Sequence, residues 1–375
     1  MTRSKGMLGK SQKVEGVQDS SVLQAGGDIY VGLTYTEVKD LCQTLIAAEV
    51  GRLTQEAEVD FRQRLEAFEQ RFYERLEQLP NKESIEKLKQ PGVQLCIHDA
   101  ILSSMKTDDD LTKEQLQEML IDRLNVDEND TERAVIEDAI EKATKVSKPL
   151  MALMVALQFR VLLMPGPLKA MVDHVFVQMG ELFKVLEDLS NLDIAYGKQM
   201  QCVVDMSPLK MAAPYEDMLL RNYDLHFRHF MKQGQFNQFR EAHPEIQHGI
   251  RIGNMDNMSI IGLDGLKPDL AEEDWEISLM GSSTRFLKDL LLGQGKDYMI
   301  PALDILLQQM PPLTKEEMRA YLTGLNPGWQ SLFSVFSRPD INNLQLTPVG
   351  NYLALVYTRN ITHNSAEFLG EIYKG

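Results

Sequence analysis

The sequence predicts a mainly α-helical protein with a short N-terminal β-strand or hairpin, a long helix and a multi-helical body. Apolar residues recur at steps of three and four through most of the chain, which is the spacing of one helix face. The clearest strand pattern is confined to residues 22–33, where two short apolar runs flank Gly-Gly-Asp. A length of 375 residues is enough for two or three units with buried cores.

The N-terminal region divides into a tail and a strand. Residues 1–21 are polar, and we expect them to be disordered. In the strand at residues 22–33, Gly26, Gly27 and Asp28 fit either a two-residue hairpin turn or a bulge. A lone hairpin is marginal in water, so we expect the strand to pair between copies of the chain. The predicted self-assembly residues are Val22, Leu23, Gln24, Gly26, Gly27, Asp28, Ile29, Tyr30 and Val31.

Residues 34–146 are predicted to form one helical module that opens with a long helix. Thr34 or Thr36 can cap this helix, and the apolar residues between 57 and 79 follow an 11-residue repeat along one face. If it is continuous to Leu79, the helix is on the order of 65 Å long, although Gly51 is a point at which it could break or bend. Shorter helices are predicted at residues 91–105, after a capping-box pattern at residues 112–115, and after Asp130 or Thr131.

Residues 147–375 are predicted to form a helical body with an irregular insertion near residues 233–293. An apolar helix at residues 150–164, which contains Gln158 and Arg160, turns at Pro165-Gly166-Pro167 into an amphipathic arm, so residues 150–189 form a helical hairpin. At about 15 residues, the apolar helix is shorter than the roughly 20 that span a membrane, so a buried core helix explains it better. Other predicted elements are a short strand at 200–206, helices at 215–231, 301–309 and 314–322, and a short extended piece before a last helix capped by Thr347.

Composition disfavours several classes of partner. The chain has 39 basic and 55 acidic residues, and its formal net charge of −16 repels nucleic-acid backbones and anionic membranes. Its three cysteines are far apart and follow no disulfide or metal-site spacing, and the N-terminus lacks the apolar run of a signal peptide. We therefore expect a cytoplasmic protein that binds neither nucleic acid nor membrane.

No pattern predicts a catalytic, cofactor or metal site. His226 and His229 are spaced to share a metal on one helix, but no nearby Cys or Glu completes a ligand set. Cys96 and His98 would point apart on a helix, so they do not form a nucleophile and base. Asp108-Asp109-Asp110 lacks the spaced ligands of a calcium loop and is expected to be a solvated flank of a helix. We predict no catalytic residue, no cofactor and no metal.

Two segments carry a resemblance to a known family. One is Gln24-Ala25-Gly26-Gly27-Asp28-Ile29, followed by Tyr35-Thr36-Glu37-Val38-Lys39-Asp40-Leu41 at the start of the long helix, and the other is Leu346-Thr347-Pro348-Val349-Gly350. Through them the chain resembles an uncharacterised family of bacterial proteins associated with defence against phage. The resemblance implies assembly through the short strand rather than chemistry. Residues 233–293 have no counterpart in it.

Three functional hypotheses remain open. In the first, the protein is a non-enzymatic, self-assembling interaction or sensor protein that forms a homo-oligomer and recruits or senses a protein partner. In the second, it is an effector that perturbs membranes with the apolar hairpin at 150–189, although Arg160, Asp173 and Glu181 make insertion costly. In the third, it is an enzyme whose site is assembled from distant residues.

Overall fold

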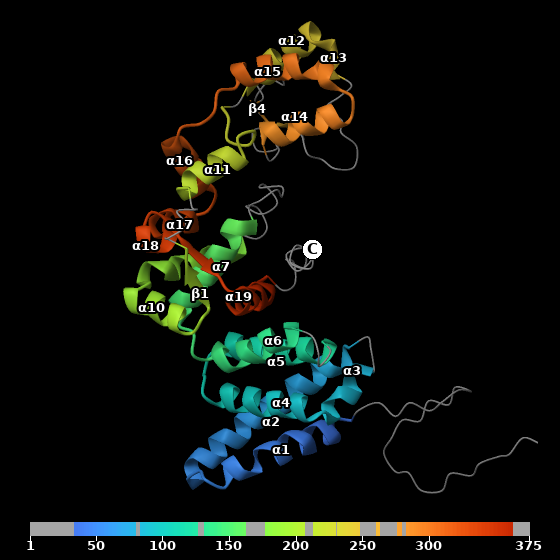
Figure 1. Cartoon of the computed structure of the whole chain (residues 1–375), viewed down its shortest axis with the longest axis vertical. Coiled ribbons are helices and arrows are strands. Elements are labelled where there is room, and N and C mark those ends of the chain that lie inside the picture. The colour runs from blue at the N-terminus through green and yellow to red at the C-terminus, as the bar shows by residue number, and fades with distance from the viewer. Residues whose placement is uncertain are drawn as a thin grey trace, which may run out of the picture.

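The computed structural model describes residues 34–79, 83–126, 131–162, 177–206, 213–229, 231–247, 260–262, 276–279 and 283–362. Most of these residues lie in helices, which confirms the mainly α-helical class. Figure 1 shows three helical parts along the long axis, which we call the N-terminal module, the body and the arm. The predicted tail at 1–21 and the strand at 22–33, with all of its self-assembly residues, lie outside the described residues.

The long helix is not continuous to Leu79, because it breaks at Gly51, the point at which the sequence allowed a break or bend. Residues 51–54 separate two helices, which pack against each other. This packing buries the predicted apolar stripe against Cys42 and Ile46, a contact that one continuous helix could not make. Thr34 caps the first piece in a capping box with Glu37. The module contains α1 (Tyr35–Val50), α2 (Gln55–Glu77), α3 (Glu83–Glu86), the 3-10 helix η1 (Lys87–Lys89), α4 (Pro91–Met105), α5 (Asp110–Asn125) and α6 (Thr131–Ala143).

The start of α5 differs from the predicted capping box at residues 112–115. Asp109 is the capping residue, and its carboxylate accepts a hydrogen bond from the backbone N–H of Thr112 at 3.0 Å. The helix therefore begins earlier, at Asp110, and the acidic run provides its cap. By contrast, α4 begins at Pro91 and ends at Met105, as predicted.

The body surrounds α7 (Lys148–Leu162), whose residues from 150 to 159 are all buried. The expected core helix is confirmed, and no described helix is both long and apolar enough to cross a membrane. The Pro165-Gly166-Pro167 turn lies outside the described residues, so only the end of the predicted second arm, α9, is seen against α7. The other body elements are α9 (Val177–Lys184), η3 (Val185–Asp188), α10 (Asn191–Gln199), β1 (Val203–Asp205), α11 (Tyr215–Asn222), α16 (Lys315–Leu325), α17 (Gly328–Phe336), α18 (Pro339–Asn342), β5 (Leu344–Leu346) and α19 (Pro348–Ile361).

A sharp corner joins β5 to α19 and is built from the Leu-Thr-Pro-Val-Gly segment. Strand β5 pairs antiparallel with β1, which lies in the predicted short strand. Beyond the pair, the N–H of Thr347 donates to the carbonyl oxygen of Cys202 at 3.1 Å, and its hydroxyl accepts from the N–H of Gly350 at 3.1 Å. Thr347 is thus the predicted helix cap, and Pro348 occupies the first helical position. From this corner α19 packs against α5, α6 and α7.

The arm is an insertion between α11 and α16 with its own small core. Buried residues from Leu225 to Met310 form this core, separate from the main one. The described part of residues 233–293 contains three helices and two strands, so the expected irregular structure is wrong there. The arm elements are β2 (Met231–Lys232), α12 (Gln233–Ala242), α13 (Pro244–Gln247), β3 (Ile260–Gly262), β4 (Glu276–Leu279), α14 (Thr284–Gly293), η7 (Asp297–Met299) and α15 (Ile300–Gln309), with strand order β2-β4-β3.

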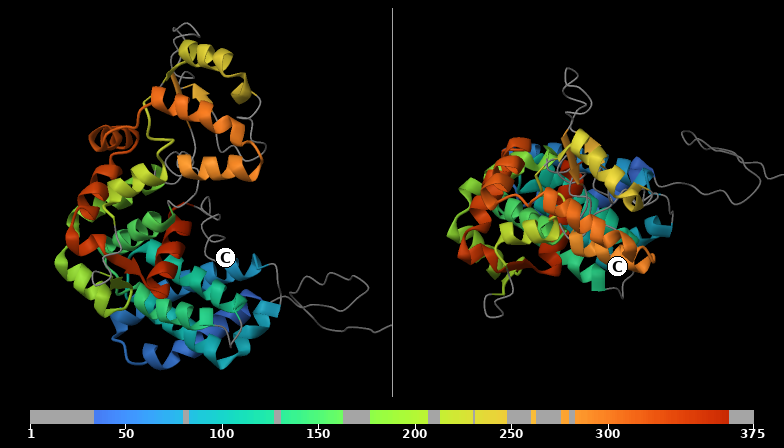
Figure 2. Two further views of the ribbon diagram at one scale, coloured as in Figure 1. Left: turned by 45° about the horizontal axis from the view of Figure 1, so that its top comes forward. Right: turned by 90° about the horizontal axis from the view of Figure 1, so that it is seen from above.

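The chain enters and leaves the arm through two paired segments. The N–H of His229 donates to the carbonyl oxygen of Pro311, and the N–H of Leu313 donates to that of Phe227, each at 2.9 Å. Just before this crossing, Asp224 accepts the first N–H of α14 from Thr284 at 2.7 Å. The predicted helix at 215–231 is therefore wrong beyond Asn222. Figure 2 shows the arm projecting from one end of the molecule.

One carboxyl group in the core of the N-terminal module lacks a partner. Glu69 of α2 is fully buried, and neither of its oxygens has a hydrogen-bond partner among the described residues. Burial raises the pKa of Glu69 from 4.5 to about 7, and Lys39 and Gln43 partly oppose this rise. Because the folded state holds this proton to a higher pH than the unfolded state, the free energy of unfolding should fall as pH rises from about 4.5 to about 7.

We expect Glu69→Gln to stabilise the protein above pH 7 by on the order of 2–3 kcal/mol, because the amide avoids a buried charge. Urea unfolding followed by circular dichroism between pH 5 and 8 measures the effect. Some pH dependence will remain in the variant, since burial also raises the pKa of Glu118 to about 7. The control is Glu56→Gln, an exposed position in the first turn of α2 that does not contribute to the pKa of Glu69. An equal pH dependence in Glu69→Gln and the wild type would contradict the assignment.

Candidate binding site

A pocket of about 540 Å³ lies where the arm joins the body. Helices α11 and α16, which flank the insertion, form one side, and α17 and α18 of the body form the other. A volume of this size is typical of sites for small ligands. We call it the arm-root pocket, and its lining residues are Pro214, Tyr215, Glu216, Arg319, Phe333, Phe336, Ser337, Pro339, Asn342 and Asn343.

Ion pairs between α11 and α16 close the side of the pocket that these two helices form. Arg319 contacts the carboxylate of Glu216 through both Nε and Nη2, with Nε at 2.5 Å. Lys315 pairs with Asp217 at 2.5 Å one turn earlier on α16. The guanidinium of Arg319 also lies over the ring of Phe333, 5.5 Å from its centroid. The two helices that flank the arm, α11 and α16, are thus joined to each other and to α17.

Aromatic rings from α11 and α17 line the pocket. The ring of Tyr215 lies 4.6 Å from that of Phe336 and 6.1 Å from that of Phe333. Burial raises the pKa of Tyr215 well above its usual value, so the hydroxyl stays protonated. This hydroxyl and Oδ1 of Asn342 are buried and have no hydrogen-bond partner among the described residues. The aromatic rings therefore give the pocket a largely apolar wall.

A buried arginine lies behind this wall. Arg160 of α7 donates from Nη1 to the carbonyl oxygen of Asn342 at 2.7 Å and from Nη2 to that of Leu344. Its guanidinium lies 5.4 Å from the centroid of Phe336. Burial lowers the pKa of Arg160, and no described carboxylate forms an ion pair with it. Its charge is offset inside the protein by these carbonyl dipoles and by the ring face of Phe336.

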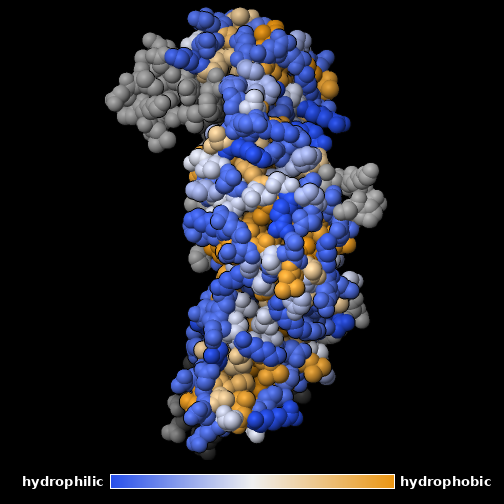
Figure 3. All heavy atoms as spheres, turned by 90° about the vertical axis from the view of Figure 1, so that its left-hand side faces the viewer, coloured by the Kyte–Doolittle hydropathy of each residue, from blue (hydrophilic) through white to orange (hydrophobic). Residues whose placement is uncertain are grey.

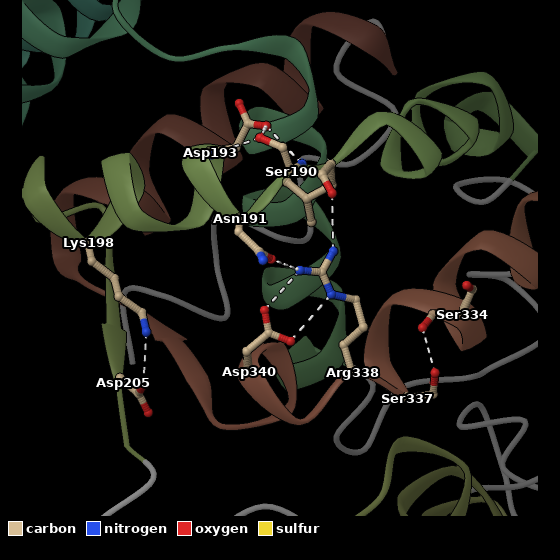
Figure 4. A network of polar contacts seen from close by, with 10 residues as sticks. Ser190, Asn191, Asp193, Lys198, Asp205, Ser334, Ser337, Arg338 and Asp340 are labelled. Atoms are coloured by element: carbon tan, nitrogen blue, oxygen red, sulfur yellow. Dashed lines mark hydrogen bonds and ion pairs between the residues drawn. The ribbon is translucent and has the colours of Figure 1, made fainter.

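A polar network fixes the outer wall of the pocket to α10 (Figure 4). Arg338 lies between two lining residues and donates to the carbonyl oxygen of Leu189 at 3.1 Å and to Oδ1 of Asn191 at 2.7 Å. It also pairs with Asp340 at 2.9 Å, which lowers the pKa of that carboxyl group. Ser190 caps α10 next to this contact. The wall is therefore held by several elements at once.

The space-filling view in Figure 3 faces the side that carries α10 and α16 to α18. Hydrophilic atoms cover most of this side, and apolar atoms gather at mid-height and again toward the lower end. Exposed apolar side chains of its elements include Leu192 of α10 and Leu325 of α16.

The residues considered for chemistry do not come together in one site. His226 and His229 follow the end of α11 instead of sharing a helix; the ring of His226 lies 5.9 Å from that of Tyr321, and His229 lies 3.6 Å from Glu317. Cys96 is buried, which raises the pKa of its thiol to about 11. Within the described ranges, no group of three or more His, Cys, Asp or Glu side chains could hold a metal ion.

The pocket residues were not predicted as a site. Tyr215 marks only the start of a predicted helix and Arg319 lies inside another, while Phe333 and Phe336 lie in α17, which was not predicted. Arg160 is the one residue that carried a usable signal, because a charged side chain within an apolar helix must find polar partners. That signal shows that Arg160 needs hydrogen-bond acceptors but does not show where in the sequence they lie.

Comparison with known proteins places the chain in a family. A protein-family model whose description reads only ":-like" matches residues 32–370. No curated protein and no solved structure matches the chain. The segments Tyr35–Leu41 and Leu346–Gly350 lie within the matched residues, whereas Gln24–Ile29 precedes them. Because the match spans most of the chain, the protein belongs to this family.

Proposed function

We propose that the protein is a non-enzymatic interaction and sensor protein that self-assembles through residues 22–33 and acts in bacterial defence against phage. The observation that carries the sensor role is the arm-root pocket, which is lined by residues of α11 and α16, the two body helices that flank the arm, and by residues of α17, α18 and the chain beside them. The assembly role rests on the apolar strand pattern, and the defence role rests on the resemblance described above.

An occupant of this pocket would link α11 and α16, the helices that flank the arm, to α17. Any molecule that contacts Glu216 or Arg319 on one side and Phe336 on the other binds most tightly at one arrangement of these helices. Because the arm is carried by α11 and α16, such differential affinity would also shift the population of arm positions. The aromatic lining suits a planar or apolar ligand.

The lining favours binding over chemistry. Its one carboxylate, Glu216, is already paired with Arg319, and the hydroxyl of Ser337 donates to the carbonyl oxygen of Ser334 at 2.7 Å. Groups held in this way position a ligand through shape and hydrogen bonding. We accordingly propose a recognition site for a small molecule or for a short segment of a protein partner.

The test fills the pocket and measures protection from phage. We expect bacteria that express the wild-type chain to give fewer plaques with at least one phage of a broad panel, and Ser337→Trp to abolish this protection because the indole occupies the ligand's space. Ser334→Trp is the matched control, since Ser334 is exposed on the same helix but does not line the pocket. Circular dichroism of both variants checks their fold.

Two outcomes would contradict the proposal. Undiminished protection by a folded Ser337→Trp variant would exclude a role for the pocket. A wild-type chain that leaves plaque counts unchanged across the whole panel would remove the defence role.

A further inference from the structure

A second concave surface lies on the body, away from the arm-root pocket. It measures about 480 Å³ and is formed by α6, the end of α10, β1 and the first residues of α19. Apolar side chains that line it include Val135, Val203, Val204 and Val349. We call this surface the β1 groove. The side chain of Val204 is 42% exposed there, although Val203 beside it is buried.

The groove combines apolar surface with few charges. Its charged lining residues are Asp138, which pairs with Lys142 at 2.5 Å, and Lys198, which pairs with Asp205 at 2.8 Å. Helix α19 begins at Pro348 in the groove, and the N-terminal end of a helix carries a partial positive charge, so an acidic group close to that end is favoured within a mainly apolar occupant. Strand β1 also has a strand neighbour, β5, on one side only among the described residues. An extended apolar segment with one acid fits these features.

We infer that the β1 groove receives residues 22–31 of a second copy of the chain. This inference rests on the self-assembly proposed above and names its acceptor surface. The sequence pattern of the segment predicts an extended strand, since it contains β-branched and aromatic residues, and Asp28 is its one charged residue. Its apolar side chains, such as Ile29, match the valines of the groove, and Asp28 matches the N-terminal end of α19.

The geometry of the N-terminal module points to a second copy instead of the same chain. Only three residue steps separate Val31 from Thr34, which span about 10 Å at full extension. Helix α1, which begins next to Thr34, packs on α4, and α4 packs on α6, which lines the groove. Figure 1 shows these helices as successive layers. Two interhelical spacings come to roughly 16–20 Å, beyond the reach of the segment's own linker.

The test measures the mass of full-length variants by light scattering. We expect the wild type to exceed the protomer mass, and both Ile29→Pro in the strand and Val349→Glu in the groove to reduce it to that of the protomer. Glutamate suits a position near a helix N-terminus, so Val349→Glu should keep its fold, as circular dichroism will show. Leu192→Glu is the control, because Leu192 is 78% exposed on α10 and does not line the groove.

A crosslink identifies the contact directly. Chains carrying only Ile29→Cys are mixed with chains carrying only Val204→Cys and oxidised, and a disulfide-linked pair is expected on denaturing gels. The three native cysteines are buried, which keeps the background low. Replacing Val204→Cys by Leu192→Cys in the mixture should abolish the pair.

The outcomes separate this inference from the assembly proposal. If Ile29→Pro lowers the mass but Val349→Glu does not, and the mixed chains form no crosslink, assembly stands and the groove is not its acceptor. A wild type of protomer mass overturns both. A third chain that carries both Ile29→Cys and Val204→Cys is oxidised in the same way. If a disulfide forms within this chain and none forms between the mixed single-cysteine chains, the second-copy assignment is overturned.

Discussion

Replacing Gly350 with alanine is expected to destabilise the protein by about 3–5 kcal/mol. An added Cβ would lie 1.9 Å from the carbonyl oxygen of Cys202 and 2.8 Å from its carbonyl carbon. Both atoms belong to backbone that cannot move freely, because the same oxygen accepts the N–H of Thr347 and the next residues pair with β5. Relief of the clash therefore requires α19 to leave the body. Urea unfolding of Gly350→Ala followed by circular dichroism measures the loss.

Gly324→Ala is the matched control for this substitution. Gly324 lies within α16, is exposed, and has open space where a Cβ would be added. Alanine favours a helix over glycine, so this variant should gain about 0.5–1 kcal/mol. If the free energy of unfolding of Gly350→Ala changed by less than about 0.5 kcal/mol, the corner between β5 and α19 would be able to relax, and its close approach to Cys202 would not require glycine.

Leu153→Asp is expected to prevent folding. Leu153 is fully buried in α7, which packs against α19, η3 and β5, so the carboxylate would enter an apolar interior without a partner. We expect loss of the soluble protein or of its helical circular dichroism. Leu192→Asp, at an exposed site on α10, should fold normally. A Leu153→Asp variant that stays folded and loses only the ability to make liposomes leak would support the membrane-perturbing hypothesis instead.

Local signals predicted elements whose ends are set by their own neighbouring residues. Pro91 opens α4, Thr314 caps α16, and Thr347 caps α19, because a fixed φ angle or a side-chain oxygen acts within one turn. The start of α5 was misplaced because Asp109 and Thr112 are both good capping residues three positions apart, and the actual cap uses both.

Features that depend on distant residues could not be predicted. The chain folds back at Gly51 because the apolar face of α2 is buried against α1, α4 and α5, and the positions of these three helices cannot be read from the residues around Gly51. Beyond Asn222, the buried residues Tyr223, Leu225 and Phe227 alternate in steps of two, a departure from helical spacing that is too short to distinguish from a helix continuing. The folded arm and helices α10 and α17 were missed.

The candidate site could not be predicted from the sequence, for a related reason. Tyr215, Arg319 and Phe336 come from three helices, and the first two are brought together only because the intervening chain leaves and re-enters the body at one point. No motif marks such a meeting. The same limit applies to the β1 groove, which gathers residues from α6, α10, β1 and α19.

The position of α19 at the end of the chain also affects how the protein folds during its synthesis. This helix covers α7, yet the ribosome makes it about 200 residues later, an interval of roughly 10–40 s at about 5–20 residues per second. Throughout that time α7, whose residues 150–159 are all buried in the folded protein, lacks this cover. We therefore expect the nascent chain to need chaperones that bind apolar segments, and we expect slower translation between α7 and α19 to increase its aggregation and proteolysis.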